Sequence, residues 1–311
     1  MVFCLLLLGL IFMKNKVTVV IPTRNRLKTL KEVIQSYINQ KDVKEILIID
    51  DFSDQPIENT DFSLALKEAN NPSITLRVIN NEKREGAAKS RNKGIKNAQS
   101  EYILFGEDDA YIDDDYVKNL INKITNDKSI GAISGQIIYL EPEENKHSAK
   151  TRFLEKPISV DPFDTDMFTI NHSNPFSHDQ NVPYTHALFL SKRSDLLKYP
   201  FDDKFVFGNG YREESTSQVK MFINGLHIVV TPSTYCYHFH RIDVPSGGQR
   251  TNHFHRIISI LTNNYFFYSK YYRKIAIKKQ LSRNIISANF LFIWKFMMSV
   301  YVYPLFRKIF K

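Results

Sequence analysis

Several common residue patterns are missing from this 311-residue chain, and each absence excludes a class of protein. The chain has two cysteines, Cys4 and Cys236, which lie too far apart in sequence to suggest a disulfide framework or a zinc site. No Gly-x-Gly-x-x-Gly pattern follows the first β-branched run, which disfavours a Rossmann dinucleotide fold. The chain also lacks a Gly-x4-Gly-Lys-Ser/Thr loop, which excludes a P-loop enzyme. We therefore expect a protein of a reducing compartment that belongs to neither of these nucleotide-binding classes.

Acidic residues are missing from the last part of the chain. The formal net charge is +9, and residues 244–311 contain twelve Lys or Arg and no Asp or Glu. A basic segment can bind nucleic acid or an anionic membrane surface, and the many large apolar residues here favour the membrane. The segment has no recognisable nucleic-acid-binding motif, so we expect no nucleic-acid partner.

The two ends of the chain carry apolar stretches. Ile285–Phe306 contains one charge, Lys295, and its aromatic residues and basic flanks are typical of a helix in the membrane interface. A membrane span and a helix packed on the protein's own core remain alternatives. We expect residues 251–311 to form a basic, aromatic, helical segment that docks on a membrane. Val2–Phe12 is too short to span and lacks a charged region before it, so we expect residues 1–15 to be an apolar extension or a start-codon artefact.

The first half of the chain alternates between apolar runs and helical patterns. The runs that predict buried strands are Val17–Ile21, Glu45–Ile49, Ile74–Ile79 and Tyr102–Phe105. This alternation predicts an α/β fold with a doubly wound, mostly parallel sheet and helices on both faces. The polar segments TRNR, DDFS, NEKREG and GEDD follow the four strands, so we expect them to meet at one rim and form a nucleotide site.

Three consecutive carboxylates follow the fourth strand: Glu107, Asp108 and Asp109. Carboxylates packed this closely repel one another, and a divalent cation relieves that repulsion while it binds phosphate oxygens. A solvated acidic turn is the alternative interpretation. The position at the carboxyl end of a buried strand favours the metal site.

The second half of the chain is less regular. Glu141–Pro183 reads as a long loop region that frames an acceptor site, and Tyr184–Leu190 is strand-like. Glu213 and Glu214 then stand at the head of a helix that closes at Gly225, where one of them can serve as a proton acceptor. Ordinary partners of the helix dipole are the alternative.

Two further groups follow in the same half. His238 and His240 alternate along an extended segment, so their side chains should face opposite ways, and one of them can ligate metal while the other is structural. Arg241 and Arg250 flank a glycine-bearing loop and suit a diphosphate, with a plain surface loop as the alternative.

Four ordered segments resemble the family 2 glycosyltransferases with the GT-A fold: VTVVIPTRNR, EILIIDDFSD, GAAKSRNKGIKNAQSEYILFGEDD and GYREESTSQVKMFINGLHI. The resemblance covers residues 16–250. It implies a nucleotide-binding half at about residues 16–140 and an acceptor half at about 141–250. It further implies a nucleotide-diphosphate sugar donor, a divalent cation (Mn²⁺ or Mg²⁺), and inversion at the anomeric carbon.

The resemblance also assigns roles by position. Residues implied at the nucleotide sugar are Pro22, Thr23, Asn25, Asp51, Arg91 and Asp108. Residues implied at the cation are Glu107, Asp109 and either His238 or His240. Glu214, next to Glu213, falls at the position of the general base. This sequence departs from the family at three places: Glu107 stands where Asp is commoner, Glu214 stands at the base position in place of Asp, and Thr216 and Lys220 replace the usual Asp and Arg in the later helix.

The absence of a Gln-x-x-Arg-Trp motif and of a set of spanning helices argues against a processive polysaccharide synthase. We therefore expect an inverting, metal-dependent enzyme that adds one sugar to a hydroxyl of a glycan or lipid-linked acceptor in cell-surface polysaccharide or glycoconjugate synthesis. We expect it at the cytoplasmic face of the membrane. The alternatives are a nucleotidyltransferase and a catalytically silent nucleotide- or glycan-binding module.

Overall fold

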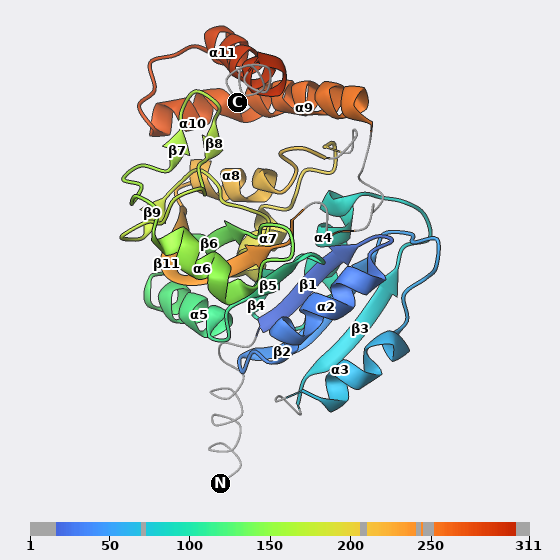
Figure 1. Cartoon of the computed structure of the whole chain (residues 1–311). Helices are drawn as coiled ribbons and strands as arrows, with labels where there is room; N and C mark the ends of the chain where they lie inside the picture. The colour runs from blue at the N-terminus through green and yellow to red at the C-terminus, as the bar shows by residue number, and fades with distance from the viewer. Residues whose placement is uncertain (1–16, 70–72, 206–209, 241–243, 245–251, 303–311) are drawn as a thin grey trace.

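The computed structural model describes residues 17–69, 73–205, 210–240, 244 and 252–302, and it contains one large sheet covered by helices (Figure 1). In one half of the sheet, neighbouring strands run parallel in the spatial order β3-β2-β1-β4. These strands are β1 (Val17–Thr23), β2 (Val43–Asp50), β3 (Thr75–Asn80) and β4 (Tyr102–Phe105). The doubly wound α/β arrangement predicted from the sequence is confirmed.

The other half of the sheet brings later strands against β4. The antiparallel β10 (Leu190–Lys192) joins β4 to β6 (Ile130–Tyr139), and β6 runs parallel to β11 (His227–His238). The short strands β5 (Ala110–Ile112) and β9 (Gln180–Asn181) pair antiparallel with β11. Because His238 lies opposite Ala110 in this register, the end of β11 reaches the carboxylates that follow β4.

Helices cover both faces because the side chains of each strand alternate. Val19 and Ile21 pack against α2 (Leu27–Ile38), in the same cluster as α5 (Tyr116–Asn126). Val20 points to the other face and packs against α4 (Ala87–Asn97), where a side chain larger than hydrogen at Gly94 would collide with it. The remaining helices and strands of this region are the 3-10 helix η1 (Asn59–Phe62), α3 (Ser63–Lys67), α6 (Lys146–Leu154), β7 (Phe163–Asp164), β8 (Thr169–Ile170), α7 (Arg193–Lys198) and α8 (Ser215–Ile223).

The C-terminal helices lie at one end of the molecule (Figure 1). α9 (His253–Phe267) continues through a π-helical turn at Tyr268–Tyr272 into α10 (Arg273–Lys278), and α11 (Ile285–Met297) continues into a second π-helical turn at Met298–Val302. The helical extension predicted from the sequence is therefore confirmed. Within the described residues, no helix combines the length and apolarity needed to cross a bilayer.

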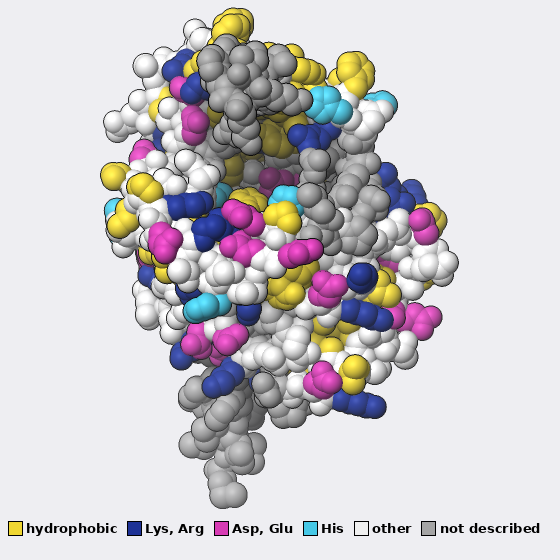
Figure 2. Space-filling model, in the orientation of Figure 1, with side chains coloured by type: hydrophobic (Ala, Val, Ile, Leu, Met, Phe, Trp, Pro, Cys, Tyr) yellow, Lys and Arg dark blue, Asp and Glu magenta, His cyan; other side chains and the backbone are white. Residues whose placement is uncertain are grey.

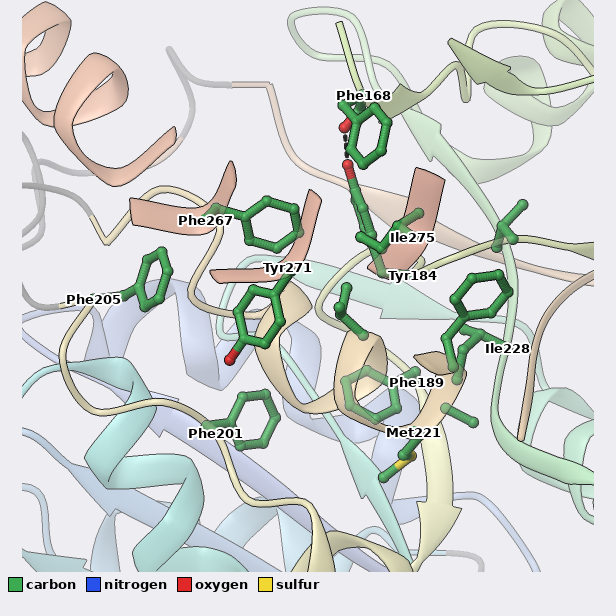
Figure 3. Close-up of a cluster of buried hydrophobic side chains, with 14 of the residues drawn as sticks. Phe168, Tyr184, Phe189, Phe201, Phe205, Met221, Ile228, Phe267, Tyr271 and Ile275 are labelled. Atoms are coloured by element: carbon green, nitrogen blue, oxygen red, sulfur yellow. Dashed lines mark hydrogen bonds between the residues drawn. The ribbon is translucent and has the colours of Figure 1, made fainter. Parts of the chain in front are cut away.

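One face of the C-terminal helices belongs to the protein's own core. Figure 3 shows Phe267, Tyr271 and Ile275 in the same buried cluster as Phe201 and Met221. The core-facing side chains of α11 are Ala288, Phe292 and Phe296. Packing on the core, which the sequence left open as an alternative, thus holds for part of this segment. Residues 1–15 and 303–306 of the predicted terminal stretches lie outside the described residues.

Two expectations for the second half were wrong in detail. Only Leu190 of the predicted strand Tyr184–Leu190 is in a strand, because side chains take up the backbone groups that precede it. The amide of Thr185 donates to Gln218 Oε1 at 2.7 Å, so it is not available to a neighbouring strand. The region Glu141–Pro183 is not all loop, since it contains α6, whose first turn is capped by the side chain of Asn145.

Candidate active site

Loops from two neighbouring parallel strands meet around the carboxylates Glu107–Asp109, here called the β4 acidic group. The hydroxyl of Thr23, which ends β1, donates to Asp108 Oδ2 at 2.7 Å. Arg26 Nη1 contacts both Asp108 Oδ1 and Asp109 Oδ2, each at 2.9 Å. Reading the sequence alone missed Arg26. The signal was present, because a residue just after β1 must lie beside the end of β4 if the two strands are parallel neighbours.

His238 completes this group from the end of β11. Its Nδ1 lies 2.9 Å from the carbonyl oxygen of Phe239, to which it donates, and its Nε2 lies 3.3 Å from Asp109 Oδ1. Glu107, Asp109 and His238 each offer a ligand atom, and all three atoms lie within 4.8 Å of one another. The carboxylate ligands suit Mn²⁺ or Mg²⁺ and the imidazole suits a transition-metal ion, so these residues fit a divalent cation. His240 is not a member of this group.

The charges of the β4 acidic group are poorly compensated. Burial raises the pKa of Glu107 to about 7 and that of Asp108 to about 6, and in both cases repulsion from Asp109 adds to the rise. Burial alone would lower the pKa of His238, but the neighbouring Asp109 and Glu107 carboxylates raise it above its ordinary value. A cation bound here would relieve the repulsion among the carboxylates.

Glu213 and Glu214, here called the α8 acidic pair, lie just before α8. Arg91 of α4 is buried and forms an ion pair with Glu213, a residue 122 positions later in the chain. Within the part of the chain that the structure describes, the Glu214 carboxylate makes no ion pair, and burial raises its pKa. The Arg91 guanidinium also interacts electrostatically with Glu107 and Glu214, so it lies between the two acidic groups.

Arg212 supports the turn that carries the α8 acidic pair. Its backbone is left-handed, with φ of 74°, and its side chain is buried. Nε donates to Asn264 Oδ1 of α9 at 3.1 Å, and Nη2 donates to the carbonyl of Met167 at 3.0 Å. Five aromatic rings lie within 6 Å of the guanidinium: Tyr184, Tyr211, Phe267, Tyr268 and Phe292. This cage ties the turn to α9 and α11.

The loops predicted to bind the nucleotide are joined by side-chain hydrogen bonds. Asn25, in the left-handed region with φ of 56°, donates through Nδ2 to Asp54 Oδ2 at 3.0 Å and accepts from the amide of Asp54 at 2.8 Å. Asp51 is buried and accepts from the amides of Glu85 at 2.7 Å and Gly86 at 2.9 Å. The Asp51 carboxylate therefore also holds the loop that leads into α4.

Apart from His240, the predicted site residues fall into three sets. The structure brings together the β4 acidic group, Arg91, the α8 acidic pair and His238. Pro22, Thr23, Asn25 and Asp51 lie at or just after the ends of β1 and β2, on the same rim. Arg241 and Arg250 lie outside the described residues. On the face shown in Figure 2, the surface is hollowed below the C-terminal helices, with acidic side chains inside the hollow.

The family model described as glycosyl transferase family 2 matches residues 18–190. The cholesterol galactosyltransferase of Borreliella burgdorferi is 31% identical over 160 residues, which is 50% of this chain and 43% of that enzyme. The chain thus spans less than half the length of this relative.

Two solved structures share the fold at low sequence identity. Staphylococcus aureus TarS, residues 1–349, matches with a TM-score of 0.56 and 16% identity over 92% of this chain and 72% of that one. The mannosyltransferase PcManGT of Pyrobaculum calidifontis, in complex with GDP-Man and Mn²⁺, matches with a TM-score of 0.55 and 16% identity. That match covers 83% of this chain and 64% of that structure.

Proposed function

Because this chain belongs to glycosyl transferase family 2, we propose that it transfers one sugar from a nucleotide-diphosphate sugar to an acceptor hydroxyl, with inversion at the anomeric carbon. The observation that carries this proposal is the placement of two acidic groups on either side of Arg91. One of them is suited to a cation, and the other contains Glu214, a carboxylate whose charge is not taken up by an ion pair in the described residues.

In the proposed reaction Glu214 accepts the proton of the acceptor hydroxyl, and the hydroxyl oxygen forms a bond to the anomeric carbon from the face opposite the donor diphosphate. The bond from the anomeric carbon to the diphosphate oxygen breaks, and the electron pair leaves with the nucleotide diphosphate. Glu213, neutralised by Arg91, holds that guanidinium in place rather than taking the proton. A raised pKa makes Glu214 a stronger base than an exposed glutamate.

Other residues of the chain would bind the donor. Glu107, Asp109 and His238 would hold the divalent cation, which supplies positive charge for the diphosphate. We assign Asp51 to the base, and Pro22, Thr23, Asn25, Arg91 and Asp108 to the rest of the nucleotide sugar. Arg241 and Arg250 remain candidates for the diphosphate, and His240 remains a candidate for a structural role. Residues 16–140 would then form the nucleotide-binding half, and residues 141–250 the acceptor half.

We propose a glycan or a lipid-linked molecule of the cell surface as the acceptor, and the inner face of the cell membrane as the location. The name of the Borreliella relative, a cholesterol galactosyltransferase, supports a membrane lipid as one possible acceptor class. The family match favours sugar transfer over the nucleotidyltransferase that the sequence left as an alternative.

The test is thermal unfolding in the presence of UDP, GDP, dTDP and CMP, each with and without Mn²⁺. A ligand at about one hundred times its dissociation constant stabilises the native state by about 2.7 kcal/mol, which raises Tm by about 4 °C for a chain of this size. We expect one nucleotide to give such a rise only with Mn²⁺, and Asp109→Asn to abolish it.

Asp114→Asn is the matched control, because Asp114 is an exposed carboxylate in the next turn and should leave the rise unchanged. If no nucleotide raises Tm under any condition, the proposed donor site is wrong. If the Asp114 variant loses the response as Asp109→Asn does, the cation is not held by the β4 acidic group.

A further inference from the structure

α11 is apolar on two opposite sides, and only one of them is covered. Ala288, Phe292 and Phe296 face the core. A second stripe consists of Ile286, Phe290, Ile293, Trp294 and Met297, whose exposed fractions are 79%, 69%, 43%, 57% and 37%. At about 100° per residue, these five side chains fall within an arc of about 100° on the side away from the core. A helix that is apolar all round normally has both of its sides buried.

The exposed stripe continues onto α9. A groove of about 320 Å³ runs between the two helices, and its apolar lining comes from Leu261 and Tyr265 of α9 and from Ile286, Phe290 and Ile293 of α11. Phe254 lies three turns before Tyr265 on α9 and is 68% exposed. The exposed stripe of α11, the groove, and Phe254 and Tyr265 of α9 together form one apolar surface, here called the outer face. Exposed apolar surfaces of this extent mark interaction sites.

The charge of the C-terminal segment favours one kind of partner for the outer face. Residues 244–311 contain no acidic residue, so nearby carboxylates must come from elsewhere in the chain. Asp166 forms ion pairs with Arg283, whose Nη1 lies 2.7 Å from Oδ1, and with Lys295, whose Nζ lies 2.6 Å from Oδ2. Arg273 and Lys274 of α10 are exposed and form no ion pair within the described residues. A second copy of the chain would bring the same positive charge to the contact, whereas an anionic lipid surface complements it.

We infer that the outer face of α9 and α11 docks on an anionic bilayer surface, with Phe290 and Trp294 in the boundary between headgroups and acyl chains. Arg273 and Lys274 contact the headgroups. The ion pair between Lys295 and Asp166 keeps the one charge of α11 turned away from the lipid, so the helix lies in the membrane plane rather than across it. This inference deepens the proposed function by fixing which side of the enzyme meets a lipid-linked acceptor, but lipid binding itself requires no sugar transfer.

Trp294 makes the inference directly measurable, because it is the only tryptophan in the chain. The full chain is mixed with vesicles of equal parts phosphatidylcholine and phosphatidylglycerol, and with vesicles of phosphatidylcholine alone. We expect Trp294 emission to shift to shorter wavelength with the anionic vesicles and to be quenched by lipids brominated on the acyl chain. Cosedimentation should show binding at least tenfold stronger to the anionic vesicles, since each nearby basic side chain adds to the attraction.

Substitutions test whether the outer face, rather than another part of the protein, binds the vesicles. Ile286→Ser with Phe290→Ser should weaken vesicle binding tenfold or more, because two apolar side chains no longer enter the lipid. Leu64→Ser is the matched control, since Leu64 is 67% exposed on α3, which lies at the opposite end of the molecule from the C-terminal helices (Figure 1), and its binding should equal that of the original chain. An unchanged Tm and circular dichroism spectrum for both variants confirms that the fold is intact.

The inference is overturned if Trp294 emission does not respond to anionic vesicles and the protein stays in the supernatant. It is also overturned if the Ile286 and Phe290 substitutions leave lipid binding intact but convert a dimer, measured by light scattering, into a monomer. That second result would assign the outer face to a second copy of the chain. Neither measurement uses a nucleotide sugar, so neither result depends on the proposed catalytic residues.

Discussion

The two acidic groups of the site differ in how their charge is balanced. The β4 acidic group contains three buried or half-buried carboxylates, and the positive groups that contact it are Arg26 and His238. Burial and mutual repulsion raise the pKa values of Glu107 and Asp108, which means that the group favours the addition of positive charge.

In the α8 acidic pair, the positive charge of Arg91 goes to one glutamate instead of being shared by both. Arg91 neutralises Glu213, while the Glu214 carboxylate makes no ion pair within the residues that the structure describes. Two adjacent glutamates thus differ because a single arginine from α4 pairs with only one of them. The location of counter-charges, rather than the number of carboxylates, is the basis on which we propose a cation site in one group and a proton acceptor in the other.

The largest effect we predict separates the two members of the α8 acidic pair. Glu214→Gln should lower kcat about a thousandfold, because it removes the proton acceptor from the transition state. Nucleotide and Mn²⁺ binding, measured by calorimetry, should stay within about twofold, since the β4 acidic group is untouched. The measurement is the initial rate of nucleotide diphosphate release with the donor identified by thermal unfolding.

Glu213→Gln is the matched variant for this prediction. It retains Glu214 and should keep more of the activity than Glu214→Gln does. If the two substitutions lower kcat equally while both proteins remain folded, the division of roles between the two glutamates is wrong.

A second prediction concerns the contribution of Arg91 to the stability of the fold. Arg91→Met should destabilise the protein by about 3 to 5 kcal/mol, because it leaves the buried Glu213 carboxylate without its partner. Unfolding by urea measures the effect. The double variant Arg91→Met with Glu213→Met should recover most of the loss, since no buried charge is left unpaired. A double variant less stable than Arg91→Met would contradict this account.

The smallest effect we predict is the pH dependence of stability without metal. The native-state pKa values of Glu107, about 7, and Asp108, about 6, lie above those of an unfolded chain, about 4. Between these limits the native state binds more protons than the unfolded state, so stability falls as pH rises from about 5 to 8. The raised pKa of His238 acts in the same direction. The expected change is on the order of a few kcal/mol.

This prediction is checked by Tm across that pH range in EDTA and in saturating Mn²⁺. The cation compensates the carboxylates, so the slope with Mn²⁺ should be shallower, and Glu107→Gln should flatten the slope in EDTA. Carboxylates with lowered pKa values, such as Asp166 and Asp202, lose their stabilising effect only below this range, as the pH falls through those values. Equal slopes of Tm against pH in EDTA and in Mn²⁺ would show that the β4 acidic group does not bind the cation.

The first half of the fold was predictable because each strand there is a short apolar run that ends in polar residues. Parallel strands place those polar ends on one rim, so the nearness of Thr23, Asp51 and Asp108 follows from strand order. The nearness of Arg26 to the end of β4 follows from the same strand order, but its contact with two aspartates also depends on a side-chain direction that the strand pattern does not specify.

The second half was less predictable for two physical reasons. Backbone groups near Thr185 are satisfied by side chains such as Gln218, so an apolar run there does not become a strand. α11 is apolar on both sides, and hydrophobic periodicity cannot tell which side the core will cover. The pairing of Arg91 with Glu213 joins distant segments, and no local pattern records it.

The cage around Arg212 has a consequence for synthesis of the chain on the ribosome. Asp166 and its partner Lys295 are 129 positions apart, and Phe292 closes the cage from the same late segment. At a translation rate of about 5 to 20 residues per second, the aromatic side chains made earlier wait on the order of ten seconds for these partners. The pairs β1–β2 and β2–β3 wait for less time, because their partners are no more than 30 positions apart in sequence. The nascent chain therefore exposes aromatic surface around Arg212 that the finished protein buries.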